Sequence, residues 1–214
     1  RTKAIMPVHL YGHPCNMDLL EPLCEKYELL MIEDAAEALG SEWMGKKVGT
    51  FGDAATFSFF GNKTISTGEG GMILFKDPKI AEKARVLRDH GMSKDKRYWH
   101  EVIGYNYRLT NMQAAIGVAQ MEKFQDILNN KIKISSSYDS YFKEVEGIMK
   151  LPNKLQYSLH SNWLYGVVLE DEIDRDVVCN ELLALGIETR PFFYPLHSMP
   201  PYGQFKRSES LSTS

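Results

Sequence analysis

Residues 29–33 form an almost continuous apolar run, and this run limits the possible folds more than any other part of the sequence. A strand that is apolar on both faces is typical of a parallel sheet covered by helices. Two patterns precede it: a shorter apolar run at 3–8, and residues 16–28, where apolar side chains recur at helical spacing behind Asn16, a favourable N-cap. Strand, helix and strand in this order predict a βαβ unit.

The remaining patterns extend this α/β fold and divide it into two domains. Thr110 and Gln113 form a capping box, from which a helix is expected to run to about residue 142, with room for a break. After Gly147 a new series of strand and helix patterns begins. The other expected elements are strands at 54–59, 72–75, 163–169 and 187–190, and helices at 78–90 and 174–185, the last ended by Gly186. We therefore predict a partial, mostly parallel sheet with helices on both faces in residues 1–130, and a small α+β domain in residues 131–214.

Composition excludes several classes of protein. Lys and Arg total 25 against 28 Asp and Glu, a net charge of −3, which argues against a nucleic-acid or anionic-membrane binder. No apolar run reaches the roughly 20 residues that a membrane-spanning helix needs. The three cysteines form neither a disulfide framework nor a metal-ligand motif. They indicate a reducing compartment, and we expect the cytoplasm and no metal.

Asp34 is the first candidate for chemistry. It directly follows the run 29–33 and precedes two alanines. Open α/β sheets bind ligands at the carboxyl ends of their strands, and small neighbours let a flat ring approach a carboxylate closely. An aspartate that caps the next turn would occupy the same place in the sequence, and position alone does not separate the two interpretations.

Lys63 is the second candidate, within TFSFFGNKTISTGEGG at residues 56–71. It follows a strand-like run that ends in two phenylalanines and a Gly-Asn turn. An amine held in such a place can act as a nucleophile, although most lysines are solvated surface charges. The neighbouring glycines match neither a dinucleotide-binding fingerprint nor a P-loop, so they do not support nucleotide binding by those routes.

Asp34, Lys63 and Ser58 are more informative together than singly. Pyridoxal phosphate chemistry needs a lysine to form a Schiff base with the cofactor aldehyde and a carboxylate to keep the pyridine nitrogen protonated. It also needs hydrogen-bond donors for the phosphate, and Ser58 can supply one. All three residues lie where strands are expected to end, so they can face the same crevice.

Six stretches of the chain resemble the pyridoxal phosphate-dependent sugar aminotransferases of the DegT/StrS type, in the order that this family has. The resemblance implies the fold-type-I aminotransferase architecture. Residues 57–71 and 98–111 are most similar to members that convert GDP-4-keto-6-deoxymannose to GDP-perosamine. The six stretches are HLYGHPCNMD (9–18), IEDAAEALGS (32–41), GTFGDAATFSFFGNKTISTGEGGM (49–72), LRDHG (87–91), WHEVIGYNYRLTNMQAAIG (99–117) and ETRPFFYPLHSMPPY (188–202).

The resemblance assigns a role to each cofactor-binding residue. It makes Lys63 the Schiff-base lysine and the catalytic residue, places Asp34 on the pyridine nitrogen and brings Ser58 to the phosphate. It places Glu37 beside the cofactor ring, where many relatives carry glutamine and an acid alters the hydrogen bond to the ring hydroxyl. Asn106, within GYNYR, would reach the phosphate of the cofactor held by the partner subunit, which implies a homodimer with shared active sites.

The resemblance also implies the substrates. Arg190 and His197 fall in a segment that approaches the sugar nucleotide in relatives; a surface charge and a loop histidine are the alternative interpretations. The substrate would be a nucleotide-linked keto sugar, with glutamate as amino donor. Relatives that dehydrate sugars carry histidine in place of Lys63, so the lysine favours amine transfer.

Relatives have further sequence on both sides of the matching region. An upstream segment supplies a Gly-Thr phosphate cup and an aromatic residue that stacks on the cofactor ring. The resemblance therefore implies a fragment of the enzyme. The alternative is a non-catalytic interaction or regulatory module that retained the aminotransferase fold, and Lys63 and Asp34 argue against it.

Overall fold

The computed structural model describes residues 1–150, 152 and 155–202. The chain divides into two compact units. The first contains residues 1–144 and 152–165, and the second contains residues 145–151 and 166–214. Residue 130, where the sequence places a domain boundary, lies inside helix α4 (Phe124–Phe142), which belongs wholly to the first unit.

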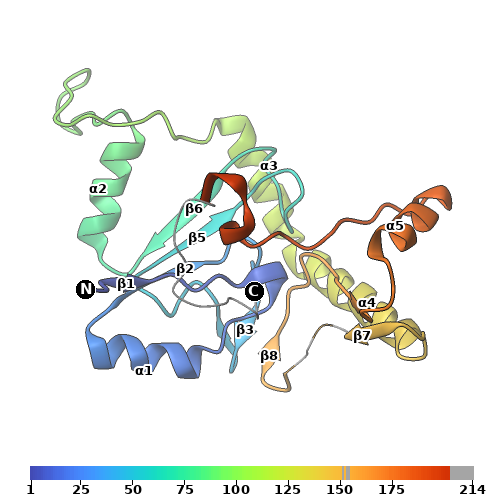
Figure 1. The fold of residues 1–214 in the computed structure, drawn as a ribbon. Coiled ribbons are helices and arrows are strands. Elements are labelled where there is room, and N and C mark those ends of the chain that lie inside the picture. Colours follow the sequence, from blue (N-terminus) through green and yellow to red (C-terminus); the bar gives the residue numbers. More distant parts are fainter. Residues whose placement is uncertain (151, 153–154, 203–214) are drawn as a thin grey trace. The chain divides into compact units, whose positions relative to one another are not determined.

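A four-stranded sheet forms the centre of the first unit (Figure 1). Strand β1 pairs in parallel with β2, and β2 with β5, while β6 runs antiparallel to β5. The predicted mostly parallel sheet is therefore confirmed, with an antiparallel strand at one edge. In order across the sheet, the strands are β1 (Ala4–Ile5), β2 (Leu30–Asp34), β5 (Ala54–Ser58) and β6 (Gly71–Phe75).

Strand β1 is shorter than the predicted 3–8. Pro7 has no N–H to donate to a neighbouring strand, so regular pairing stops before it. The Pro7 carbonyl still accepts a hydrogen bond from Asp34 N (2.9 Å), and Val8 forms an isolated parallel bridge with Asp34.

The helices of the first unit begin where their capping residues predict. The Asn16 side chain accepts a hydrogen bond from Leu19 N (3.2 Å), and Thr110 and Gln113 form the expected capping box. The long helix breaks at Lys123, whose backbone is not helical (φ −103°, ψ 6°). Besides α4, these helices are α1 (Met17–Tyr27), α2 (Pro78–Arg88) and α3 (Asn111–Glu122).

The first unit also contains a second, antiparallel sheet, which the sequence did not predict. Its strands are too short for a periodic pattern to be visible in the sequence. They are β4 (Lys46–Lys47), β3 (Glu42–Trp43) and β8 (Ser158–Leu159), in this order across the sheet. Through the pairing of β8 with β3, the segment after residue 155 becomes part of the first unit.

After Gly147, neither of the two strands that the sequence predicts forms over its predicted range. The expected strand 163–169 is wrong over most of its length, because the backbone of Trp163 bonds to Tyr11 O instead of to a strand. The expected strand 187–190 is also wrong: its segment pairs with no strand among the described residues, and it leads into Pro191. In the described part of the second unit, β7 (Ile148–Lys150) pairs with β9 (Val168–Leu169). They are followed by helix α5 (Arg175–Ala184) and the 3₁₀ turns η2 (Leu196–Ser198) and η3 (Pro200–Tyr202).

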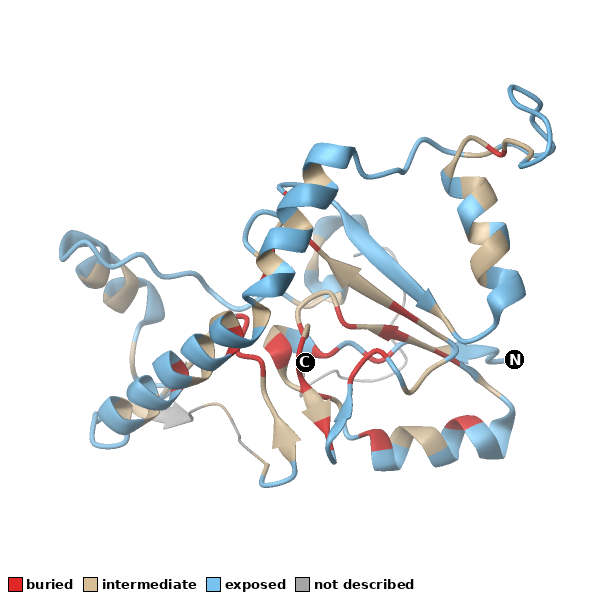
Figure 2. Ribbon diagram, turned by 180° about the vertical axis from the view of Figure 1, so that it is seen from behind, coloured by how far each residue is buried: buried red, intermediate tan, exposed pale blue. Residues whose placement is uncertain are grey.

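The core of the first unit lies between α1 and the sheet. Met17 and Cys24 of α1 pack with Met31 of β2 and Trp43 of β3. Figure 2 shows the buried positions gathered along the central strands and the loops that follow them. Helices α2, α3 and α5 contain no buried residue.

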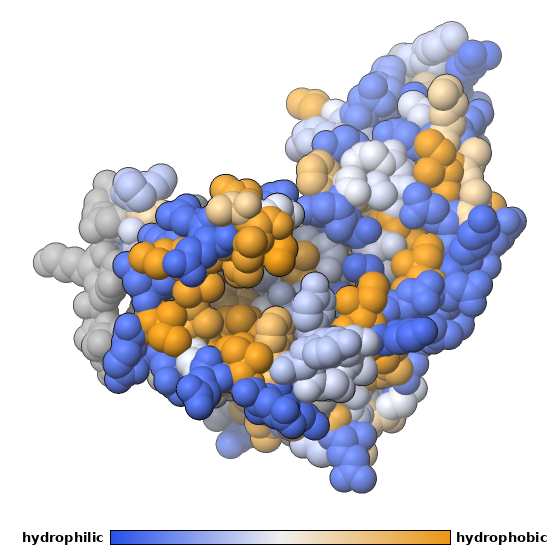
Figure 3. Space-filling view, turned by 90° about the vertical axis from the view of Figure 1, so that its right-hand side faces the viewer, coloured by the Kyte–Doolittle hydropathy of each residue, from blue (hydrophilic) through white to orange (hydrophobic). Residues whose placement is uncertain are grey.

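Apolar side chains also reach the surface (Figure 3). Strand β6 exposes about half of the surface of Met72 and Ile73. Exposed apolar area of this kind marks surfaces suited to contact with other protein segments. None of the helices in the described part of the chain combines the length and apolar character needed to cross a membrane.

Leu128 tests the attachment of α4 to the turn around Gly40. Leu128 is 1% exposed, and a side chain on Gly40 would meet Phe124 and Leu128 of this helix. We expect Leu128→Ala to lower the free energy of unfolding by about 2–4 kcal/mol, through lost burial and the remaining cavity. The control Ile134→Ala removes an exposed side chain of the same helix and should change it by less than about 0.5 kcal/mol. Equal effects in urea titrations of the two variants would contradict this packing.

Candidate active site

Asp34 and Ser58 are the last residues of two neighbouring parallel strands, β2 and β5. The register pairs Asp34 with Thr56, so both strand ends lie at the same edge of the sheet. Asp34 Oδ1 accepts a hydrogen bond from Ala36 N (3.0 Å), which is the turn-capping contact that the sequence left open. Ser58 Oγ accepts one from Phe60 N (3.3 Å). The carboxylate and the hydroxyl are thus set where open α/β sheets bind ligands.

The side chain of Lys63 turns into the protein rather than into solvent. It is 13% exposed, and its Nζ lies 3.7 Å from Glu37 Oε1. The same Nζ lies 3.8 Å from the centre of the Trp163 ring. Glu37 is three residues after Asp34, so the amine is held beside the end of β2. The surface-charge interpretation of Lys63 is therefore wrong.

Glu37 is fixed by a second contact. Its Oε2 accepts a hydrogen bond from Tyr11 N (2.7 Å), and the backbone of Tyr11 has a left-handed φ of 55°. A positive φ is uncommon for a bulky residue and marks a locally constrained turn. The Tyr11 ring stacks on that of Trp163, with their centres 5.9 Å apart. Tyr11 and Trp163 are site residues that the sequence did not identify, although Tyr11 belongs to the matching HLYG stretch.

Helix α3 holds the chain that follows Lys63. Both groups of the Gln120 side chain bond to the backbone of Ser66, at 3.0 and 2.9 Å. Gln113 Nε2 donates to Glu69 O (3.3 Å). Between these anchors and the lysine, Ile65 is 2% exposed. The loop that carries the amine is therefore fixed on the C-terminal side of Lys63.

A buried carboxylate lies immediately before Asp34. Glu33 is fully buried and accepts hydrogen bonds from the backbone N–H groups of Gly49, Phe51 and Gly52, at 2.6–2.8 Å. Burial alone would raise the pKa of Glu33, but hydrogen bonds from His9 and these backbone groups outweigh it and lower the pKa.

His9 is the side-chain partner of Glu33, with Nε2 3.1 Å from Glu33 Oε2. On the other side of the ring, Cys15 N donates to His9 Nδ1 (3.0 Å). An N–H aimed at Nδ1 needs the lone pair of that nitrogen, so we assign the ring proton to Nε2, where it bonds Glu33. His9 N also donates to Asp34 O (3.0 Å), which connects this buried pair to the site.

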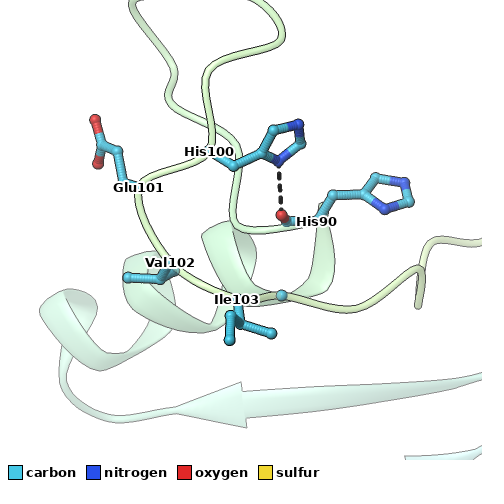
Figure 4. Close-up of a pocket in the computed structure, with 6 residues that line it drawn as sticks. His90, His100, Glu101, Val102 and Ile103 are labelled. Atoms are coloured by element: carbon cyan, nitrogen blue, oxygen red, sulfur yellow. Dashed lines mark hydrogen bonds between the residues drawn. The ribbon is translucent and has the colours of Figure 1, made fainter.

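Asn106 lies elsewhere in the first unit. It is exposed and forms an isolated antiparallel bridge with Asp89, while Arg108 pairs with the Asp89 carboxylate (3.0 Å). A pocket of about 610 Å³ lies in the same segment, and two of its lining residues are joined by a hydrogen bond between His100 Nδ1 and His90 O (2.9 Å; Figure 4). The pocket contains none of the predicted site residues. It is lined by His90, His100, Glu101, Val102, Ile103 and Gly104.

Arg190 and His197 belong to the second unit. Arg190 is exposed and pairs with Glu188, with 2.9 Å between Nη2 and Oε1. His197 lies in η2 and is partly exposed. Their roles toward a sugar nucleotide stay predictions. The described residues include no group of three or more His, Cys, Asp or Glu side chains arranged to bind a metal ion.

The sequence of the DegT/DnrJ/EryC1/StrS aminotransferase family matches this chain over residues 1–214. The chain belongs to this family. It is 48% identical to the GDP-perosamine synthase of Caulobacter vibrioides and 45% identical to that of Escherichia coli O157:H7, over 94% and 95% of its own length. It spans 55% of the length of each of these relatives.

Solved structures of aminotransferases share the fold of this family member. Helicobacter pylori PseC, an aminotransferase involved in the biosynthesis of pseudoaminic acid, superposes with a TM-score of 0.93 at 30% identity, covering 99% of this chain and 58% of PseC. S. venezuelae DesV, solved in complex with a ketimine intermediate, gives a TM-score of 0.88 at 35% identity, covering 99% and 56%. The predicted fold-type-I aminotransferase-like architecture is therefore confirmed.

Glu33→Gln tests the buried anchor behind Asp34. At pH 7 we expect a loss of about 2–4 kcal/mol in the free energy of unfolding, because an amide NH₂ would face backbone donors. A lowered pKa means that the carboxylate contributes fully above its usual value of 4.5 and loses its contribution as pH falls through the folded-state pKa. The difference in the free energy of unfolding between wild type and variant, measured by urea titration, should therefore become smaller below about pH 4.

Glu42→Gln provides the matched control. Glu42 pairs with Lys47 near the surface, so its loss should cost less than about 1 kcal/mol. If Glu33→Gln lowered the free energy of unfolding by the same amount at pH 7 and at pH 3.5, the result would contradict an ionised Glu33 carboxylate.

Proposed function

We propose that this protein transfers an amino group to a nucleotide-linked 4-keto-6-deoxy sugar, using pyridoxal phosphate. The observation that carries the proposal is the placement of the Lys63 amine beside Glu37, three residues beyond Asp34 at the end of β2. An amine and a carboxylate at one sheet edge are the two groups that pyridoxal phosphate chemistry requires. They favour an enzyme over a non-catalytic module.

The residues present fit this cofactor. Pyridoxal phosphate supplies an aldehyde that takes up amino groups and, with its ring nitrogen protonated, a ring that accepts an electron pair. Lys63 would hold the cofactor covalently and, once released, move a proton at the reacting carbon. Asp34 would hold the proton on the ring nitrogen. Ser58 would donate to the phosphate, and Glu37 would lie at the ring and keep the freed Lys63 in reach.

The relatives support the choice of sugar substrate. Two GDP-perosamine synthases are 45% and 48% identical to this chain, which supports GDP-4-keto-6-deoxymannose as the sugar and GDP-perosamine as the product. We propose glutamate as the amino donor. Arg190 and His197 are the residues we propose to contact the sugar nucleotide.

We propose that the active protein is a homodimer in which Asn106 reaches the partner's cofactor phosphate. The segment around Asn106 supports an interface, since it exposes Tyr105, Tyr107 and 92% of Ile103. We also place the protein in the cytoplasm, because Cys15, Cys24 and Cys179 are free thiols.

Lys63→Ala tests the covalent role of the amine. Protein mixed with pyridoxal phosphate, reduced with borohydride and digested should carry the cofactor mass on the peptide that contains Lys63. The label should disappear in Lys63→Ala and persist in Lys79→Ala, which removes an exposed lysine of α2. Equal labelling of both variants would remove Lys63 from this role.

Asp34→Asn tests the carboxylate separately. Asparagine has nearly the same shape but does not stabilise a proton on the ring nitrogen. We expect the variant to retain borohydride-trapped cofactor while turnover of the keto sugar falls by about 100-fold or more, because one preorganised electrostatic contact is lost. Turnover within a fewfold of wild type would exclude Asp34 from its proposed place.

A further inference from the structure

Trp163 touches the amine of Lys63 from a segment far along the chain, and the proposed function assigns it no role. The tryptophan is 6% exposed and lies shortly after the short strand β8. A buried tryptophan is ordinarily explained by packing alone. Trp163 makes two polar contacts, one with the amine of Lys63 and one with the backbone of the residue before it, and packing does not explain them.

The first contact is made by the ring face. Lys63 Nζ lies 3.8 Å from the centre of the Trp163 ring. A tryptophan face is the aromatic surface that attracts an ammonium group most strongly, and the attraction grows where water is excluded. Lys63 is 13% exposed, so this contact forms in a partly desolvated place.

The second contact is made by the edge of the same ring. Trp163 Nε1 donates a hydrogen bond to the backbone carbonyl of Asn62 (2.9 Å), the residue directly before Lys63. One side chain therefore holds both the backbone at the base of the lysine and the amine at its tip. Phenylalanine in this place could supply the face but not the donor.

Trp163 is itself held rigidly enough to act in this way. Its backbone N donates to Tyr11 O (3.1 Å), its carbonyl accepts from Lys131 Nζ (3.4 Å), and its ring stacks on that of Tyr11. Tyr11 in turn donates its backbone N–H to Glu37, the second partner of the amine. The two groups that contact Lys63 Nζ are thus connected through a single residue.

We infer that Trp163 is a positioning residue for Lys63, whose ring face holds the amine and whose indole N–H fixes the loop that carries it. This inference rests on the proposed function, in which Lys63 must leave its cofactor bond and return to the same place. A lysine side chain has four flexible bonds and samples many conformations when unrestrained. Trp163 and Glu37 restrict it from two sides to a position beside the end of β2.

The test measures the amine directly, without cofactor. The protein is exposed briefly to an amine-acetylating reagent, and mass spectrometry gives the labelling rate of Lys63 relative to that of exposed Lys79. We expect Trp163→Leu, which removes both contacts, to raise this ratio about fivefold, by loss of the cation–π contact and of shielding. Trp163→Phe keeps a ring face and should stay within about twofold of wild type.

Fluorinated tryptophan separates the two contacts and guards against misfolding of the leucine variant. Fluorination weakens the ring face but keeps the shape and the N–H, and each added fluorine should raise the Lys63 ratio further. Amide hydrogen exchange reports the loop: the Lys63 N–H, bonded to Phe60 O (3.0 Å), should exchange faster in Trp163→Phe but not in the fluorinated protein.

Unchanged labelling of Lys63 in both Trp163→Leu and the fluorinated protein would overturn the inference. Unchanged amide exchange in Trp163→Phe would overturn its anchoring part. These readouts need no pyridoxal phosphate, whereas borohydride trapping at Lys63 tests the proposed function. A negative result for the positioning role of Trp163 can therefore be distinguished from a negative result for the proposed function.

Discussion

The arrangement of the site depends on one buried carboxylate, that of Glu33. It satisfies three backbone N–H groups of the loop 49–52 and the ring of His9 at the same time. Successive side chains of a strand point to opposite faces of the sheet. Anchoring Glu33 on one face therefore fixes Asp34 on the other. A slip of one residue in β2 would bury Asp34 without these donors, so the hydrogen bonds to Glu33 specify the register as well as stabilise it.

Four segments far apart in the sequence meet at the amine of Lys63. Glu37 and Trp163 contact the amine, and Tyr11 connects these two residues through a hydrogen bond to Glu37 and contacts with Trp163. On the far side of the loop, Gln120 of α3 holds Ser66. The lysine is thus placed by contacts from residues distant in the sequence, and such supporting contacts hold a functional side chain in one geometry.

The sequence predicts this fold well wherever the signal is local. Asn16 and the Thr110–Gln113 pair begin their helices as expected, and the apolar run before Asp34 is the central parallel strand. Asp34 and Ser58 end their strands as predicted, because parallel strands present their carboxyl ends at one edge.

The features that the sequence does not reveal depend on contacts between distant residues. Trp163 reads as part of a strand, yet its backbone bonds to the turn at Tyr11. Residues 187–190 have strand-forming composition, but Arg190 pairs with Glu188 two residues away, and the segment leads into a proline. Glu33 reads as the polar end of an apolar run. Only the loop at 49–52 shows why a charged residue is buried there.

The most direct test of the account is a crystal structure of the protein grown with pyridoxal phosphate. The account predicts continuous density from Lys63 Nζ to the aldehyde carbon of the cofactor, and an Asp34 oxygen within about 3 Å of the ring nitrogen. A cofactor bound to another lysine, or a ring nitrogen that faces away from Asp34, would contradict it.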